Sequence, residues 1–359
     1  MSQLRITLAD VARAAGVSRS TASLVLSDRG PELRISEAAQ HRVRQIAAEL
    51  GYRPNVISVG LRSGSTRTIG FISDTIATSQ LAGDMIRGAL EQAHRNGYML
   101  FIGETEGDLA DEDRLIQAML DRQVDGVIVA SMFTRERQVP TSADARPLVL
   151  LNSVPDTPGV VPAVIPDEHQ AGRDAVKLLL DAGHESIHLI GAGPSLSDVP
   201  AQTIAGQKRL AGILKALDEA GLVPASGRQC SVWLPEDGWA ATVELLRTGA
   251  RGEAIITFND RLAFGAYQAI QEAGLAVPDD FSIVSFDDHQ LASWLRPALT
   301  TFAIPHYELG RRGVELVLES PESRSPLDLE LLPMPVRLRG SVASPGIMAS
   351  GALAARDLN

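Results

Sequence analysis

The sequence predicts a small, all-α helix-turn-helix head followed by a larger α/β core, whose two lobes are doubly wound parallel sheets. Short amphipathic helical patterns around a glycine fill about the first 50 residues, whereas apolar strands alternating with helices begin at residue 68. The chain of 359 residues also exceeds the roughly 250–300 residues at which a single core stops growing. Finally, residues 1–62 hold nine arginines against five acids, although the whole chain carries a net charge of −11.

The head is predicted to contain three helices, over residues 8–14, over residues 19–26 and over a third segment that ends at Gly51. Gly16 supplies the left-handed turn after the first helix. A hydroxyl side chain that can cap the helix precedes each one: Thr7, Ser18 and Ser36. The apolar positions expected to face inward are Leu8, Val11, Ala12, Ala15, Ala22, Val25, Leu26, Val43, Ile46, Ala47 and Leu50.

A hinge is expected between head and core. Asn55 can cap a short helix, but Val59 and Gly60 are poor helix formers, and a helix of about eight residues is marginal alone. We therefore expect this helix to fold only when something stabilises it. The predicted domains are a head over residues 1–50, a hinge over 51–67, a core over 68–340 and a disordered tail over 341–359.

The core pattern consists of near-continuous apolar strands separated by helices, which is typical of parallel sheets covered on both faces. The first set has predicted strands at 68–73, 98–103, 126–131 and 147–152, with helices at 81–96 and 109–122. The second set has strands at 187–191, 229–233, 253–258 and 281–286, with helices at 203–220, 239–248 and 260–273. Such sheets bind ligands in the cleft at the carboxyl ends of their strands.

Composition excludes several classes of protein. A single cysteine, Cys230, excludes a disulfide framework and a thiolate metal cluster, and the seven histidines show no metal-binding spacing. We therefore expect no metal and no cofactor. There is no apolar run of about 18 residues and no signal-peptide pattern, so we expect a cytoplasmic protein that does not enter a membrane. A basic head on an acidic body indicates a module that binds a polyanion.

The sequence resembles the LacI/GalR (lactose-repressor) family of transcription regulators over residues 5 to about 340. The segments that carry the resemblance are TLADVARAAGVSRSTASLVL, RISEAAQHRVRQIAAELGYRPN, GHESIHLIG, FNDRLAFGAYQAI and VPDDFSIVSFDD…PALTTF. The resemblance implies a head that binds a palindromic operator as a homodimer, and a periplasmic-binding-protein-like core that senses a small molecule. The segment after the first strand lacks the family's common Asn-Pro-Phe-Phe, which leaves the aromatic wall of the ligand pocket in doubt on that side.

The second helix is expected to read DNA. Arg19 and Ser20 lie in its first turn, which is the part that enters the major groove. Leu24 offers an apolar contact to a thymine methyl group, or is a partly covered surface residue. The resemblance implies that Leu61 wedges into a minor-groove step, the alternative being packing against the core. The full set of predicted DNA contacts is Thr7, Ser18, Arg19, Ser20, Thr21, Ser23, Leu24, Ser27, Arg34, Tyr52, Asn55 and Leu61.

The effector is expected at the strand ends of the core. Asn152, Asn259 and Asp287 follow or end predicted strands, and Trp239 offers an apolar face, which suits a sugar ring. The resemblance adds Arg209 as the family's ligand arginine. We interpret two further acids as helix caps: Asp260 and Asp288. A nucleobase or an organic acid is the alternative effector.

Two other classes of function have partial support in the sequence. The segment GAGPSLS has two glycines after a strand but lacks the third glycine of a dinucleotide fingerprint. Asp260 and Asp287 resemble an acid pair for glycoside hydrolysis, but nothing in the sequence fixes their separation. We therefore expect a regulator, most simply a repressor, and not an enzyme. A solute-binding transport protein is the remote alternative, against which the basic head argues.

Overall fold

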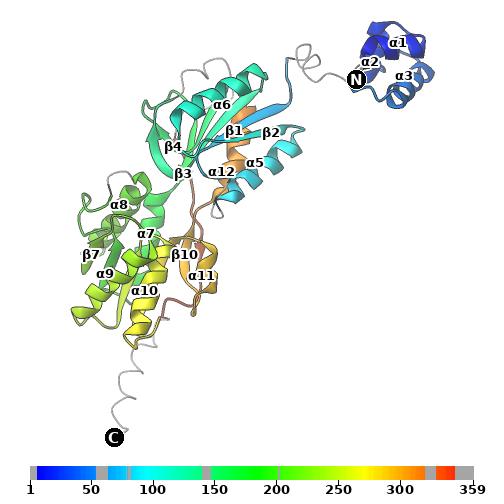
Figure 1. The fold of residues 1–359 in the computed structure, drawn as a ribbon. Coiled ribbons are helices and arrows are strands. Elements are labelled where there is room, and N and C mark those ends of the chain that lie inside the picture. Colours follow the sequence, from blue (N-terminus) through cyan, green and yellow to red (C-terminus); the bar gives the residue numbers. More distant parts are fainter. Residues whose placement is uncertain are drawn as a thin grey trace. The chain divides into compact units, whose positions relative to one another are not determined.

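The computed structural model describes residues 6–53, 64–77, 79, 82–139, 147–200, 203–319 and 329–343 (Figure 1). Contacts divide the chain into two units. The first comprises Met1–Arg67 with Asp121–Val124, and the second comprises Thr68–Leu120 with Asp125–Asn359. No helix within these described ranges is long and apolar enough to cross a membrane.

The first unit contains the three predicted helices, α1 (Leu8–Ala15), α2 (Arg19–Leu26) and α3 (Glu37–Glu49). Thr7 and Asp10 form a reciprocal capping box at the start of α1. The side chains of Ser18 and Ser36 accept hydrogen bonds from the first turns of α2 and α3, and Gly16 turns the chain at φ 65°. The sequence therefore predicted both the helices and their caps.

A small apolar core joins these helices. Its buried members are Val11, Ala12, Ala15, Ala22, Val25, Val43 and Ala47. One expected member was wrong, because Leu50 is 37% exposed. It lies at the C-cap of α3, beyond the last turn that faces the other helices.

The first lobe of the second unit is a six-stranded sheet in which all neighbouring strands of the described residues pair in parallel. From edge to edge its strands are β11 (Leu329–Leu332), β5 (Ala163–Pro166), β4 (Leu148–Pro155), β3 (Gly126–Arg137), β1 (Thr68–Ser73) and β2 (Met99–Glu104). Its helices are α5 (Gly83–Arg95), α6 (Leu109–Asp121) and α12 (His306–Leu318). The edge strand β2 is apolar in sequence but largely exposed.

The second lobe is also six-stranded. Its strand order is β12 (Val336–Arg337), β10 (Thr300–Ala303), β9 (Phe281–Asp287), β8 (Glu253–Thr257), β6 (Ile187–Gly191) and β7 (Ser226–Gln229). Its helices are α7 (Glu168–Asp181), α8 (Ile204–Glu219), α9 (Pro235–Arg247), α10 (Asp260–Glu272) and α11 (Gln290–Trp294). All pairs are parallel except β10 with β12, so one edge departs from the predicted all-parallel sheet.

The chain passes between the lobes three times, after β5, after β10 and between β11 and β12 (Figure 1). The two-lobed α/β fold is confirmed, but the lobes are not two consecutive segments. The late elements α12 and β11 return to the first lobe. Apolar periodicity identifies a strand or helix without saying which sheet it joins, so the sequence pattern could not show this return.

Three boundaries also differ from prediction. β3 continues to Arg137, six residues beyond its predicted end, whereas β7 ends at Gln229, where a strand was expected to begin. The start of the predicted tail is part of the second lobe. Ser341 is fully buried and donates to the carbonyl of Ile283, and Ala343 donates its amide to Ser282 Oγ. Residues 344–359 of that tail lie outside the described residues.

Candidate functional site

In the first unit, the N-terminus of α2 carries a cluster of hydroxyl groups. Ser18 Oγ accepts from the amide of Thr21 at 3.0 Å and lies 2.8 Å from the hydroxyls of both Ser20 and Thr21. Ser18, Arg19 and Ser20 are all exposed. The positive end of the helix and these hydroxyls together suit an anionic partner.

The arginines of residues 6–53 fall into three groups. Three pair with acids of the same unit: Arg13 with Asp10, Arg29 with Glu32 and Arg44 with Asp28. Arg42 donates to the carbonyl of Ala15 at 2.9 Å. Three others form no ion pair with any described residue: Arg19, Arg34 and Arg53. These three unpaired, exposed cations are the ones available to bind phosphate or a base edge.

The predicted DNA contacts differ in accessibility. Six are exposed: Thr7, Ser18, Arg19, Ser20, Ser27 and Arg34. Four are partly buried: Thr21, Ser23, Leu24 and Tyr52. Besides the bonded hydroxyls of Ser18, Ser20 and Thr21, the Thr7 side chain caps α1, and Ser27 Oγ donates to the carbonyl of Ser23 at 2.9 Å. Asn55 and Leu61 lie outside the described residues.

In the second lobe, Arg209 of α8 lies at the centre of a buried polar network. It is 2% exposed, and its Nε donates to Glu168 Oε2 at 2.8 Å. A second nitrogen donates to the carbonyl of Phe258, and the guanidinium lies 4.1 Å from the centre of the Phe286 ring. Burial raises the pKa of Glu168, while Arg209 opposes that rise. The predicted ligand arginine therefore already has a carboxylate partner.

Asp287 ends β9 in an unusual backbone conformation, with φ 110°. Non-glycine residues rarely adopt positive φ, and such strain is concentrated at functional sites. Burial raises the pKa of Asp287 well above its ordinary value; Arg209 opposes this, and Asp260 adds to it. A carboxyl with a raised pKa at a strand end is a candidate to contact a ligand.

Asp260 and Asp288 are not helix caps, so that interpretation was wrong. The N-caps at these positions are Asn259 and His289. Asp260 instead accepts from the amide of His289 at 2.7 Å and from Thr301 Oγ1 at 2.8 Å, and burial raises its pKa to about 7. Asp288 pairs with two arginines of the C-terminal segment, Arg337 and Arg339.

Asn259 and a tryptophan meet at the end of β8. Asn259 Oδ1 accepts from the amide of Leu262 at 2.8 Å, and its Nδ2 donates to the carbonyl of Trp233 at 3.1 Å. The Trp233 ring contacts Phe258 edge-on at 5.5 Å between centres, and its Nε1 donates to the carbonyl of Gly191, the last residue of β6. Trp233 thus lies at the strand ends.

Trp239, which the sequence analysis chose, lies elsewhere. It is 39% exposed on α9, and its Nε1 donates to Glu272, the last residue of α10. Asn259 and Asp260 stand at the opposite end of that helix. The structure therefore joins Arg209, Asp287 and Asn259 with Trp233. Trp233 was missed because the sequence predicted a strand at 229–233 that contains it, whereas β7 ends at Gln229 and leaves Trp233 beyond the strand end.

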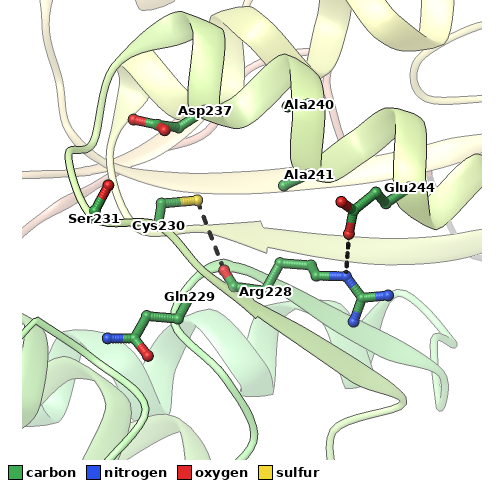
Figure 2. Close-up of a pocket in the computed structure, with 8 residues that line it drawn as sticks. All are labelled: Arg228, Gln229, Cys230, Ser231, Asp237, Ala240, Ala241 and Glu244. Carbon is green, nitrogen blue, oxygen red and sulfur yellow. Dashed lines mark hydrogen bonds and ion pairs between the residues drawn. The ribbon is translucent and has the colours of Figure 1, made fainter.

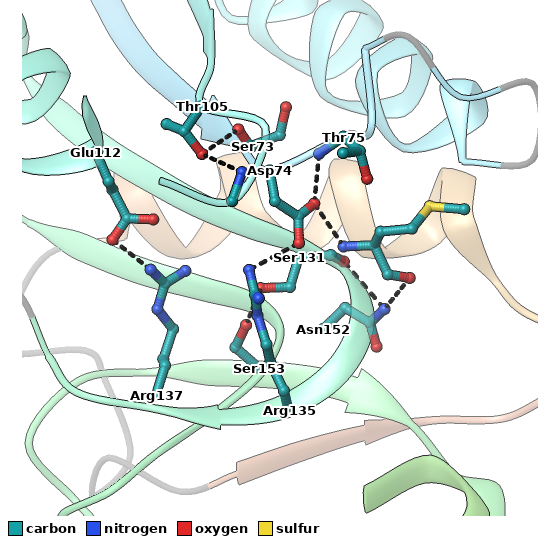
Figure 3. A network of polar contacts seen from close by, with 12 residues as sticks. Ser73, Asp74, Thr75, Thr105, Glu112, Ser131, Arg135, Arg137, Asn152 and Ser153 are labelled. Carbon is teal, nitrogen blue, oxygen red and sulfur yellow. Dashed lines mark hydrogen bonds and ion pairs between the residues drawn. The ribbon is translucent and has the colours of Figure 1, made fainter. Parts of the chain in front are cut away.

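The first lobe presents a second polar network at the ends of β1, β3 and β4 (Figure 3). Asp74 Oδ2 pairs with Arg135 at 2.7 Å, and its Oδ1 accepts from the amide of Met132 at 2.9 Å. Asn152, predicted from sequence, belongs to this network. It is 2% exposed, and its Nδ2 donates to the carbonyls of Ser131 and Met132.

Two more charged side chains extend the network. Arg137 pairs with Glu112, and both side chains are buried. Neither Nε nor Nη1 of Arg137 has a partner among the described residues. Asp74, Arg135 and Arg137 were all missed from sequence. A charged residue that follows an apolar strand could have identified them: Asp74 follows β1, and Arg135 and Arg137 follow the predicted end of β3 at residue 131.

A separate cavity of about 360 Å³ lies between β7 and α9 (Figure 2). Arg228 pairs there with Glu244 at 2.9 Å, and Cys230 Sγ donates to the carbonyl of Arg228. Burial raises the pKa of the Cys230 thiol to about 11, so it is an unreactive thiol at neutral pH. None of the predicted site residues lines this cavity. Within the described ranges, no cluster of three or more His, Cys, Asp or Glu side chains is arranged to hold a metal.

Comparisons with known proteins agree with this architecture. The family model described as "Bacterial regulatory proteins, lacI family" matches residues 7–55, and that described as "Periplasmic binding protein-like domain" matches residues 176–342. The ribose operon repressor of Escherichia coli (strain K12) is 32% identical over 319 residues, covering 87% of this chain and 92% of that protein.

Solved structures give the same picture. The lac repressor dimer bound to operator and an anti-inducer superposes with a TM-score of 0.76 at 25% identity, covering 95% of this chain and 100% of that one. A transcriptional regulator from Enterococcus faecium with bound ribose superposes with a TM-score of 0.59 at 27% identity, covering 77% of this chain and 99% of that one.

Proposed function

The chain belongs to the lacI family of bacterial regulatory proteins and is therefore a DNA-binding transcriptional regulator, not an enzyme; we propose that it is a repressor controlled by a neutral sugar. The sugar would bind at the strand ends between the two lobes of the core. The head would bind an operator in the cytoplasm. The observation that carries the proposal is the pair of polar networks at those strand ends, one in each lobe.

The charges of these networks favour an uncharged ligand. Three guanidinium groups take part, and each is paired with a carboxylate: Arg135 with Asp74, Arg137 with Glu112 and Arg209 with Glu168. An anionic effector would need positive charge that is not already neutralised by a partner, which these pairs lack. A sugar instead needs carboxylate, amide and guanidinium groups that accept from and donate to its hydroxyls, beside an apolar face.

The positions of these side chains assign each of them a role in binding the sugar. Asp287 would accept from two sugar hydroxyls, and Arg209 would donate with the N–H groups that Glu168 and the Phe258 carbonyl leave free. Trp233 would supply the apolar face that the sequence analysis assigned to Trp239. Asn152 and Asn259 remain proposed contacts, although the hydrogen bonds they make hold the strand ends in place. The relative named as a ribose repressor and the neighbour with bound ribose support a sugar.

We propose that a second copy of the chain covers the edge of the first lobe. β2 is the edge strand of that sheet, and three of its apolar side chains are exposed: Met99, Phe101 and Ile102. An exposed apolar edge strand favours pairing with another chain. A homodimer would present two heads to two half-sites, so the operator should be two-fold symmetric.

One experiment tests the function. The purified protein is used to select its binding site from random duplex DNA, and each sugar of a panel (D-ribose, D-glucose, D-galactose) is then titrated into the complex while fluorescence anisotropy is recorded. We expect a two-fold symmetric site and one sugar that changes its affinity. A site without symmetry contradicts the dimeric repressor, and an operator complex that responds to none of the sugars contradicts the proposed effector class.

A further inference from the structure

β3 carries a bulge at its carboxyl end. Its pairing with β4 is regular up to Ala130, which faces Leu151, and resumes where Arg135 faces Ser153. Residues 131–134 of β3 therefore stand opposite one residue of β4, Asn152. Bulges of this kind are frequent beside functional sites, where they redirect a side chain.

Hydrogen bonds from two neighbouring strands hold this bulge (Figure 3). Asn152 Nδ2 donates to the carbonyl of Ser131 at 3.1 Å and to that of Met132 at 3.0 Å, and its Oδ1 accepts from Thr134 Oγ1. Asp74, the residue after β1, accepts from the Met132 amide. Asn152 itself adopts φ 51°, a left-handed conformation that asparagine tolerates better than most residues. The bulge is thus fixed at both its first and its last residue.

The bulge presents one aromatic side chain to solvent. Phe133 is 58% exposed, whereas Ser131 is fully buried and Thr134 is 3% exposed. A single exposed apolar residue is ordinary on a protein surface. This one differs because it stands on a backbone fixed by buried hydrogen bonds, at the strand ends where the first-lobe network lies. β3 also contacts α8, the helix that carries Arg209 in the second lobe.

We propose that Phe133 is the first-lobe aromatic wall of the effector site and stacks on the C–H face of the sugar ring. The inference rests on the proposed function and names a residue that neither the sequence motifs nor the comparisons single out. The segment after β1, residues 74–82, contains no aromatic side chain, and Phe133 offers an exposed one on the neighbouring strand β3. Phe133 and Trp233 would then cover the ring from the two lobes, because aromatic faces contact apolar ring surfaces favourably.

The test compares variants of Phe133 with a matched control. Leu90 lies in the second half of α5, the helix that leads back to the start of β2, and is 44% exposed. Leu90→Ala therefore removes an exposed apolar side chain of the same lobe away from the carboxyl ends of the strands. Each protein is titrated calorimetrically with D-ribose, D-glucose and D-galactose, and its melting temperature is recorded without sugar. For the sugar that binds the parent, we expect Phe133→Ala to raise Kd about three- to tenfold. Phe133→Tyr should stay within about twofold, and Leu90→Ala should not change Kd.

The outcomes are distinguishable. Equal affinity of the parent and Phe133→Ala overturns the inference and leaves the proposed function intact. An equal loss in Phe133→Tyr and Phe133→Ala, or a change of oligomeric state in light scattering without a change of Kd, assigns Phe133 to packing or to subunit contact and also overturns it. If no sugar binds the parent protein, the proposed effector class fails, and this inference fails with it.

Discussion

At the scale of single residues, His306 is a buried histidine whose environment disfavours the protonated ring. It is 5% exposed at the start of α12, and neither ring nitrogen has a partner among the described residues. Burial lowers its pKa to about 4, while Asp84 in the first turn of α5 opposes that shift. The imidazole is therefore neutral in the folded protein at pH values where the unfolded chain has begun to bind a proton.

This histidine should make the protein acid-sensitive. Because the folded pKa lies below the unfolded value of about 6.5, its contribution to stability is present above pH 6.5 and is lost as pH falls toward 4. Between pH 7 and pH 5 the loss is about 2 kcal/mol. We expect His306→Phe to reduce the pH dependence of the unfolding free energy by that amount in urea titrations. It should cost little at pH 7, because it removes two unsatisfied polar atoms.

The control for this measurement is His94→Phe, since His94 is exposed at the end of α5. That variant should leave the pH dependence unchanged. Parallel stability curves for the parent and His306→Phe between pH 7 and pH 5 would show that the ring is accessible to protons in the folded state.

Residue types at strand ends were largely predictable, whereas their contacts were not. Asn259 and Asp287 follow apolar strands, so the sequence shows that they lie at one edge of a sheet. It does not show that the Asn259 amide is occupied by a helix cap and by the Trp233 carbonyl. Trp239 was chosen over Trp233 for the same reason. β7 is a short polar edge strand without an apolar pattern, so its end was misplaced.

At the scale of elements, the closest packing in the first lobe joins segments more than two hundred residues apart. A Cβ on Gly310 of α12 would lie 1.8 Å from the carbonyl oxygen of Met85 in α5. A Cβ on Gly88 would lie 2.0 Å from the carbonyl oxygen of Tyr307. The two helix backbones therefore touch at glycines, which holds the returning segment α12 onto the lobe.

Gly310→Ala should separate these helices. Alanine is a better helix former than glycine by about 1 kcal/mol, but the new methyl group overlaps backbone that cannot move without shifting α5. We expect a net loss of about 2 kcal/mol in the unfolding free energy, measured by urea titration. Gly83→Ala is the matched control, because Gly83 begins α5 with open space around its Cα and should be neutral or stabilising. Equal effects of the two substitutions would contradict close packing at Gly310.

These elements also show which parts of the fold a local sequence pattern predicts and which parts it does not. The head helices carry caps and apolar faces within one local segment, so local rules predicted them. The membership of α12 and β11 in the first lobe depends on contacts such as Gly310 with Met85, which no local pattern encodes. The bulge of β3 depends likewise on Asn152, on another strand.

At the scale of the whole molecule, the two units have separate apolar cores and opposite chemistry. The head holds its own cluster around Val11, Ala22 and Val43, while each lobe of the core has its own cluster. The head carries exposed arginines that form no ion pair with a described residue, whereas the arginines of the two strand-end networks in the core are paired with carboxylates. DNA binding and effector binding should therefore be separable by mutation.

Two substitutions test this separation in one assay. Arg19 is exposed and unpaired among the described residues, so Arg19→Ala should change stability by less than about 0.5 kcal/mol. It should weaken operator binding about tenfold or more through the lost base or phosphate contact, while sugar affinity stays that of the parent.

Asp287→Asn keeps the side-chain shape, and asparagine tolerates the positive φ of this position. It removes a carboxylate acceptor, so operator affinity should stay that of the parent while the sugar no longer changes it. Anisotropy with labelled operator and calorimetry with the sugar measure both properties on each variant. If either substitution changes both affinities together, the two sites are not independent, and Arg19 or Asp287 acts on the fold instead of on its own ligand.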